Sequence, residues 1–165
     1  MAQQGGNDGV ETVLLAAIEA AFTDVPKGAI TIHEADLLYN LGISQTERDA
    51  ARARDRDSRW QEIPDSTIRK CSHALPFLDQ IGWRYYVPAY MSWSIRHVAD
   101  RESDSVDSTI YTFSHFDDAG YARYQSLSAS QLTVVRRFLQ FMADHPGQAD
   151  DEVARDSLEK YWSRF

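Results

Sequence analysis

The chain has 165 residues, which is the length of one ordinary domain, and its 43% hydrophobic and 25% charged residues are typical of a globular protein. Its formal net charge is −8 at pH 7. A chain this acidic repels phosphate backbones, so we expect no nucleic-acid ligand and regard a basic protein as the complementary partner.

The N-terminal part predicts a disordered start and then a long helix. Residues 1–9 are rich in Gly, Gln and Asn, so we expect disorder there and a single helical domain over 10–165. The stretch from 10 to 25 has apolar residues at helical spacing, and Pro26 and Gly28 end it. The residues expected to face inward are Val10, Val13, Leu14, Ala17, Ile18, Ala21 and Phe22.

Two capping boxes mark the next two predicted helices. Thr31 with Glu34 favours a helix start, Gly42 can close that helix, and the leucines expected to face inward are Leu37, Leu38 and Leu41. Ser44 with Glu47 starts a second helix, whose alternating charges and lack of large apolar residues before Trp60 are typical of a solvated helix.

The middle of the chain predicts a helix starting near Pro64 and then an aromatic helix. Because proline is tolerated in the first turn, Pro88 places the start of the aromatic helix near Tyr86 or Val87, and it runs to Val98. Residues 100–118 are acidic and Ser-rich at first, which favours a loop. The alternation in "STIYTFSHF" leaves one short strand as the alternative.

The C-terminal part predicts two strong helices. Ser128 and Gln131 form a third capping box before an apolar stripe, and Asp150, Asp151 and Glu152 favour the start of the last helix. We therefore expect an all-α, single-domain, compact orthogonal bundle of about six or seven helices, with at most one short strand. Its core should come from helices over 11–23, 87–98, 129–143 and 151–163.

The segment "GWRYYVPAYMSW" at 82–93 has two interpretations. Its two apolar stripes wrap most of a helix, so a buried core helix is the simpler one. Tyr, Trp and Arg are also enriched at binding hot spots, so the same segment can be an interface or a pocket wall. The candidate binding residues are Arg84, Tyr85, Tyr90, Trp93 and His97.

No catalytic, metal-binding or cofactor-binding pattern stands out, and we expect no cofactor. None of the histidines has H-x-x-x-H spacing; they are His33, His73, His97, His115 and His145. The single cysteine, Cys71, excludes an intramolecular disulfide and falls on the apolar stripe with Ile68 and Leu75, so a buried structural thiol is favoured over a reactive one. Four carboxylates also flank Trp60, namely Asp55, Asp57, Glu62 and Asp65. They could line an acidic pocket beside the indole ring. The simpler account is that they cap helices and pair with neighbouring arginines.

The start "MAQQGGNDGV" has neither the basic nor the apolar region of a secretory signal. No apolar run approaches the ~20 residues needed to cross a bilayer. We therefore expect a cytoplasmic protein without a membrane partner.

Four segments resemble a bacterial family of unknown function: "WQEIP" at 60–64, "WRYYVPAYM" at 83–91, "LSASQLTVVRRFL" at 127–139 and "YW" at 161–162. The R-Y-Y-x-P-A-Y string is the specific part, and the resemblance spans about residues 11 to 163. It implies a stand-alone bacterial cytoplasmic protein and brings no activity and no catalytic residues.

Two functions follow from these observations. The first is a small acidic protein-binding module, an immunity- or antitoxin-like inhibitor or a regulatory partner, which binds a basic protein through the 82–93 segment or the acidic 100–118 segment. The alternative is an enzyme or small-molecule binder with a pocket around Arg84, Tyr90, Trp93 and His97. The oligomeric state is left open.

Overall fold

The computed structural model describes residues 4–165, and within that range the chain is helical without a strand. The nine α-helices are α1 (Gln4–Ala21), α2 (Ile32–Leu37), α3 (Gln45–Arg52), α4 (Asp65–Lys70), α5 (Gln80–Arg96), α6 (Ser105–Tyr111), α7 (Asp118–Gln125), α8 (Ala129–Ala143) and α9 (Asp151–Lys160). Three short 3₁₀ turns are η1 (Trp60–Glu62), η2 (Leu75–Phe77) and η3 (Trp162–Arg164). The predicted all-α fold is confirmed.

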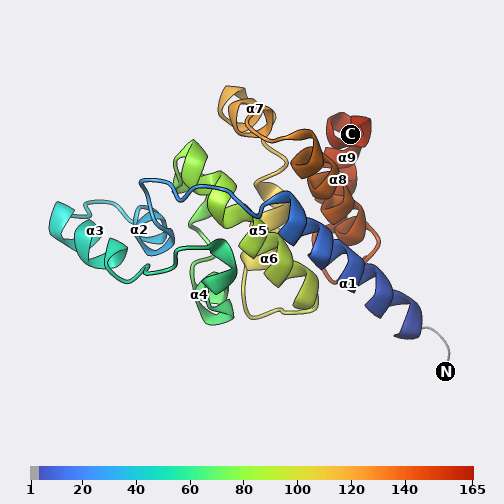
Figure 1. The fold of residues 1–165 in the computed structure, drawn as a ribbon, viewed down its shortest axis with the longest axis horizontal. Coiled ribbons are helices and arrows are strands. Elements are labelled where there is room, and N and C mark those ends of the chain that lie inside the picture. The colour runs from blue at the N-terminus through green and yellow to red at the C-terminus, as the bar shows by residue number, and fades with distance from the viewer. Residues whose placement is uncertain (1–3) are drawn as a thin grey trace.

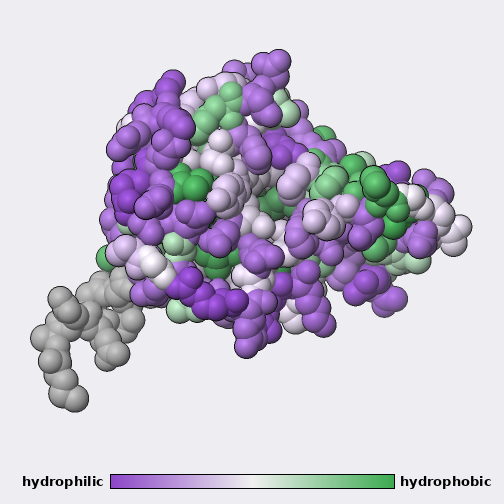
Figure 2. All heavy atoms as spheres, turned by 180° about the vertical axis from the view of Figure 1, so that it is seen from behind, coloured by the Kyte–Doolittle hydropathy of each residue, from purple (hydrophilic) through white to green (hydrophobic). Residues whose placement is uncertain are grey.

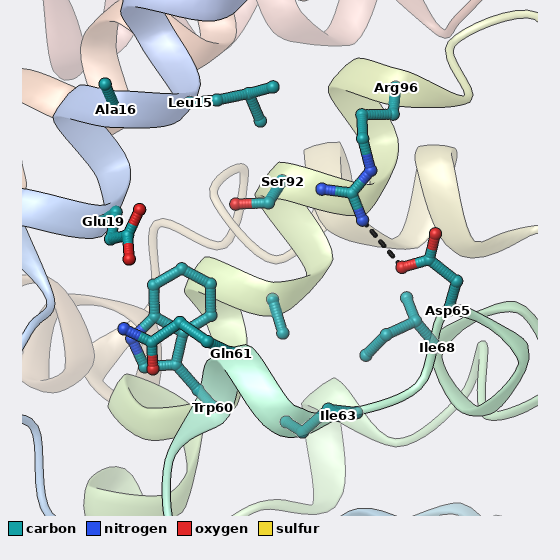
Figure 3. A pocket seen from close by; sticks show the side chains of 11 residues that line it. Leu15, Ala16, Glu19, Trp60, Gln61, Ile63, Asp65, Ile68, Ser92 and Arg96 are labelled. Carbon is teal, nitrogen blue, oxygen red and sulfur yellow. Dashed lines mark hydrogen bonds and ion pairs between the residues drawn. The ribbon is translucent and has the colours of Figure 1, made fainter.

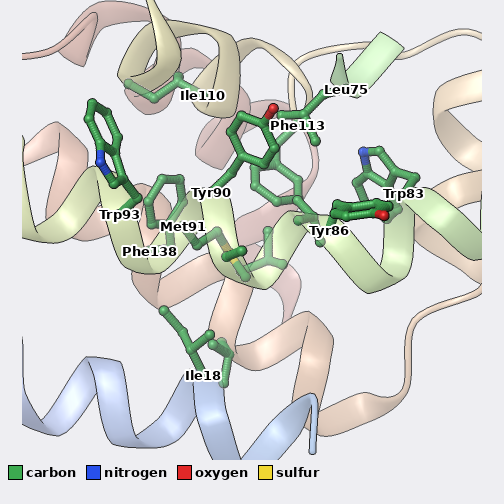
Figure 4. Packing of buried hydrophobic residues seen from close by; sticks show 14 of the residues in the cluster. Ile18, Leu75, Trp83, Tyr86, Tyr90, Met91, Trp93, Ile110, Phe113 and Phe138 are labelled. Atoms are coloured by element: carbon green, nitrogen blue, oxygen red, sulfur yellow. The ribbon is translucent and has the colours of Figure 1, made fainter. Parts of the chain in front are cut away.

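Helix α5 lies at the centre of the molecule (Figure 1). Helices α1, α6 and α8 pack against it, and α9 covers α8. Helices α2 and α3 form a lobe at one end (Figure 1). The aromatic and aliphatic side chains of α5 interdigitate with those of α1, α6 and α8 (Figure 4). The four helices expected to supply the core therefore do so, because each has an apolar face that only the others can cover.

Helix α5 begins at Gln80, about two turns before the predicted start, so Pro88 lies inside the helix. Asp79 caps this earlier start, since its side chain accepts a hydrogen bond from the Gly82 backbone. Proline in a helix interior costs about 3 kcal/mol. Thirteen of the 17 residues of α5 are buried, so its packing outweighs that cost.

The N-terminal helix starts earlier and faces differently than expected. Helix α1 begins at Gln4, and of the stretch predicted to be disordered, residues 1–3 lie outside the described residues. Leu14, Ile18 and Phe22 are buried as predicted. Val10 and Val13 are 55% and 59% exposed, so their inward placement was wrong. Val10 lines an open groove between α1 and α8, so the packing of these two helices leaves it accessible to solvent.

Two of the three predicted capping boxes are confirmed. The side chains of Ser44 and Ser128 each accept a hydrogen bond from the backbone N–H of the third residue of their helix. The side chain of that residue in turn accepts one from the backbone N–H of the serine. Thr31 makes no side-chain cap. The Glu34 carboxylate that would complete that box is instead hydrogen-bonded to two arginines of α3.

The inward placement of the α2 leucines was also wrong. Leu41 is fully exposed, and Leu37 and Leu38 are half-buried. Helix α2 ends at Leu37, so the turn that follows it points away from the core.

The segment expected to be a loop or a short strand contains helix α6. Val106, Thr109 and Ile110 of α6 are buried against α5 and α4. Thr109 donates to the Ser105 carbonyl, and Ser94 of α5 donates to the Thr109 hydroxyl. Contacts with α5 therefore stabilise a helix that the local sequence does not favour.

None of the helices within residues 4–165 combines the length and the apolar character that a bilayer crossing requires.

Candidate functional site

The aromatic residues of α5 form the core. Tyr85, Tyr90 and Trp93 are each at most 1% exposed. Tyr90 and Trp93 lie among the packed side chains of the core (Figure 4). The Tyr85 hydroxyl donates to Asp57 Oδ2 at 2.8 Å, and the Tyr90 hydroxyl donates to the Cys71 carbonyl. The polar ends of both tyrosines thus have partners inside the protein.

Arg84 and His97 are half-buried at opposite ends of α5. Arg84 Nε donates to Gln131 Oε1 at 3.1 Å, and His97 stacks on Trp93 with ring centroids 4.5 Å apart. The five predicted binding residues therefore do not converge on one place. None of them lines the groove between α2, η2 and α6 or the cavity beside Trp60. Their role in binding stays a prediction.

Cys71 is 3% exposed and reduced. Burial is the main cause that raises the pKa of its thiol to about 12, and the nearby Asp36 and Asp55 charges add to it. Because the thiolate is the reactive form, this shift and the burial of Cys71 both disfavour reaction of its thiol near neutral pH.

We expect Cys71 to resist Ellman's reagent at pH 8 in the folded protein and to react completely once the chain is unfolded in guanidinium. Thiolate formation and access are both suppressed by burial. A stopped-flow comparison of the folded and unfolded chains measures the difference. Rapid, stoichiometric reaction of the folded protein would contradict the buried assignment.

A surface groove lies where α2, η2 and α6 meet. We call it the aromatic groove and define it by Tyr39, His73, Phe77, Tyr111 and His115. Its volume is about 320 Å³, and the small residues that complete its wall are Ser72, Pro76, Ser108 and Thr112. From this side of the molecule, apolar residues also gather on the lobe that holds α2 and α3 (Figure 2).

The rings of the aromatic groove are exposed. Tyr39, Phe77 and Tyr111 are 59%, 36% and 44% accessible to solvent. Tyr39 stacks on His73 at 4.3 Å between ring centroids and meets Phe77 edge-on at 6.5 Å. Tyr39, His73 and Phe77 thus hold one another in place, while part of each ring stays exposed to water. Exposed aromatic surface is unfavourable unless a ligand or a partner covers it.

Carboxylates lie at both ends of the aromatic groove. Tyr111 donates from its hydroxyl to Asp150 Oδ2 at 2.8 Å, and this hydrogen bond is the main cause that raises the pKa of Tyr111. At the other end Asp36 accepts the backbone N–H of His73 at 3.2 Å. Burial raises the pKa of Asp36, and the hydrogen bond from His73 opposes that effect. Two carboxylates thus bind directly to residues that line the groove.

The carboxylates around Trp60 mostly have structural partners. Asp55 lies 2.5 Å from His33 Nδ1, Asp57 pairs with Lys27 at 3.0 Å, and Glu62 hydrogen-bonds the backbone of Ser58 and Arg59. The simpler interpretation from the sequence holds for Glu62, which pairs with Arg59, and for Asp65, which is the first residue of α4. The expected pairing of Asp57 with an arginine was wrong, because the fold brings Lys27 to it instead. A cavity does lie beside Trp60, and of the four carboxylates it is lined by Asp65.

The residues of the aromatic groove were not among the predicted site residues. Tyr111 lies in "STIYTFSHF", whose alternation suggested a loop or a short strand, and its neighbours Ile110 and Phe113 are buried. Nothing in the local pattern shows that Tyr39, Phe77 and Tyr111 meet, because they come from three separate elements.

Comparisons with known proteins place the chain in one family. Searches of curated proteins and of solved structures found no significant match. A family model described as a family of unknown function, DUF6714, matches residues 11–165, which is nearly the whole chain. The chain therefore belongs to DUF6714, a family whose function is unknown.

Proposed function

We propose that this protein is a small acidic binding module, of the inhibitor or regulatory kind, whose aromatic groove docks a basic protein partner. The observation that carries the proposal is the cluster of exposed rings formed by Tyr39, Phe77 and Tyr111. Covering aromatic surface of this kind is a main source of binding energy at protein interfaces, where tyrosine is enriched.

Charge argues for a basic partner. The formal net charge is −8, and Asp150 and Asp36 lie at the two ends of the groove. A partner that places an apolar side chain between Tyr39 and Tyr111, with Lys or Arg on either side, matches both the groove and its rim. Such complementarity raises the association rate and makes it depend on salt.

The alternative function, an enzyme or small-molecule binder at Arg84, Tyr90, Trp93 and His97, has less support. Tyr90 and Trp93 are almost fully buried in a packed core, and Arg84 and His97 are at opposite ends of α5. A catalytic pocket needs groups that converge on an open cavity.

We expect Tyr39→Ala and Phe77→Ala to weaken partner binding by at least tenfold each, since truncating a hot-spot side chain costs about 2 kcal/mol or more. The partner is first isolated from native lysate with the wild-type protein at low and moderate salt. Binding of the purified pair is then measured by calorimetry. Both variants should fold normally, because the two side chains are exposed.

Val13→Ala is the matched control, because Val13 is 59% exposed on α1 and lies outside the groove. The proposal requires a basic, stoichiometric partner whose binding weakens with salt, is lost in the groove variants and is kept by Val13→Ala. Equal binding by all variants, an acidic partner, or a second copy of the chain as the occupant in sedimentation experiments would each refute it.

A further inference from the structure

A second cavity, which shares no lining residue with the aromatic groove, lies between α1, η1, α4 and α5 (Figure 3). Its volume is about 360 Å³, within the range of small-molecule sites. Its apolar wall consists of Leu15, Ala16, Trp60, Ile63, Ile68 and Ala89. Its polar groups are those of Glu19, Gln61, Asp65, Ser92 and Arg96.

Trp60 forms a fixed aromatic wall of this cavity. Its indole Nε1–H donates to the Phe22 carbonyl at 2.9 Å, just past the end of α1, and the side chain is buried. The ring borders the open space below Glu19 (Figure 3). An indole face held in this way attracts a cation that approaches from the cavity.

Gln61 contributes an acceptor without a partner. Its Oε1 atom is buried and accepts no hydrogen bond from the described part of the protein. A buried acceptor of this kind is unfavourable until a donor reaches it. Gln61 lines the cavity, so a rotation of its side chain would present this acceptor to a ligand that carries N–H groups.

The charges of the cavity leave one carboxylate unpaired. Arg96 Nη2 lies 2.7 Å from Asp65 Oδ1, so these two charges neutralise each other at one side (Figure 3). Glu19 lies at the other side, near Trp60 and Gln61, and forms no ion pair with any described residue. The unbalanced charge inside the cavity is thus negative and adjoins the indole and the free acceptor.

We propose that this cavity binds an alkylammonium group. The ammonium lies between Glu19 and the Trp60 ring, where it gains a charge partner and a cation–π contact. Rotation of the Gln61 side chain then brings Oε1 to it as a hydrogen-bond acceptor. The alkyl chain lies on the apolar wall formed by Leu15, Ile63 and Ile68. A free alkylamine and a lysine side chain of a partner protein both carry this chemistry.

The first test compares three probes of the same length: hexylamine, hexanol and hexanoate. Calorimetry at low ionic strength should give saturable one-to-one binding of hexylamine and at least about tenfold weaker binding of the neutral and anionic probes. Equal binding of hexanol, or no binding of hexylamine, would overturn the proposal.

Two variants locate the site. Glu19→Gln removes the unpaired charge from an exposed helical position, and we expect hexylamine to bind about fivefold more weakly. Ala16→Leu, also at an exposed position of α1, narrows the cavity and should weaken binding further. The control is Glu159→Gln, which changes the net charge equally at an exposed site on α9 outside the cavity. Equal losses in Glu19→Gln and Glu159→Gln would show that the amine binds by overall charge and not in the cavity.

A second amine distinguishes the two sources. Nα-acetyl-lysine-N-methylamide presents the same ammonium on a peptide unit. Tighter binding than hexylamine supports the cavity as a lysine pocket for a partner chain, and weaker binding supports a free alkylamine. Both results keep the ammonium assignment. If neither amine binds, the assignment is refuted. Phe77→Ala should leave both affinities unchanged, so this test is independent of the aromatic groove.

Discussion

Replacing Glu34 by Gln should lower the free energy of unfolding by about 3 kcal/mol, the lower end of the cost of breaking a buried ion pair. The Glu34 carboxylate is fully buried and receives four hydrogen bonds of 2.7–3.0 Å, two from Arg48 and two from Arg52. The amide removes the charge and leaves both guanidinium groups against a neutral side chain. The arginines are 32% and 44% exposed and can recover some water contacts, which limits the loss.

Asp49→Asn is the matched control for this prediction. Asp49 is 59% exposed and lies 3.7 Å from Arg52, so the same chemical change at a surface pair should cost less than about 1 kcal/mol. Urea unfolding followed by circular dichroism measures both variants. Similar losses in the two variants would mean that the buried network does not hold the α2–α3 lobe in place.

The pH dependence gives a second check on Glu34. Burial by itself raises the pKa of Glu34, but the hydrogen bonds and charges of Arg52 and Arg48 outweigh it, so the pKa lies below its usual 4.5. The ionised carboxylate therefore stabilises the folded state fully above about pH 4.5, and this contribution is lost as the pH falls through the lower folded-state pKa. The stability difference between the wild type and Glu34→Gln should shrink over that acidic range. A difference that stays constant down to the acid-unfolded state would contradict the assignment.

Gly28→Ala should also destabilise the protein by about 3 kcal/mol, as severe overpacking does. A Cβ at Gly28 would lie 2.2 Å from the backbone nitrogen of Gly82 and 2.4 Å from its Cα. These atoms belong to the first turn of α5, and neither can rotate away as a side chain could. Asp79 holds the two segments together, since it accepts the Ile30 N–H at 3.1 Å and caps α5.

Gly9→Ala is the control for Gly28→Ala, and its effect should have the opposite sign. Gly9 lies in α1, and a Cβ there meets no atom within 4 Å. Alanine favours a helix over glycine by up to about 1 kcal/mol, so this variant should be more stable. Thermal unfolding of both variants measures the contrast. A Gly28→Ala protein as stable as the wild type would show that the 26–30 segment does not dock tightly on α5.

The sequence by itself determined the features that depend on neighbours along the chain. The capping boxes at Ser44 and Ser128 form between residues only three apart at a helix start, so the sequence itself brings the bonding groups within reach of each other. The apolar stripes of α8 and α9, and of α1 from Leu14 onward, predict their buried faces, since helical spacing alone puts those residues on one side. The resemblance to a family of unknown function is confirmed by the match over residues 11–165.

Only the tertiary structure decided where competing interactions meet. Glu34 could cap α2 or bind arginines of α3, and the fold brings two guanidinium groups to it. Pro88 could start a helix or lie inside one, and the packing around α5 outweighs its cost.

Both candidate sites also depend on contacts between distant segments. The aromatic groove joins Tyr39, Phe77 and Tyr111, and the Trp60 cavity joins Glu19 to Gln61 and Arg96. Local patterns report the periodicity of one element at a time. They cannot show which exposed faces of different helices come together, because that depends on how the whole core packs.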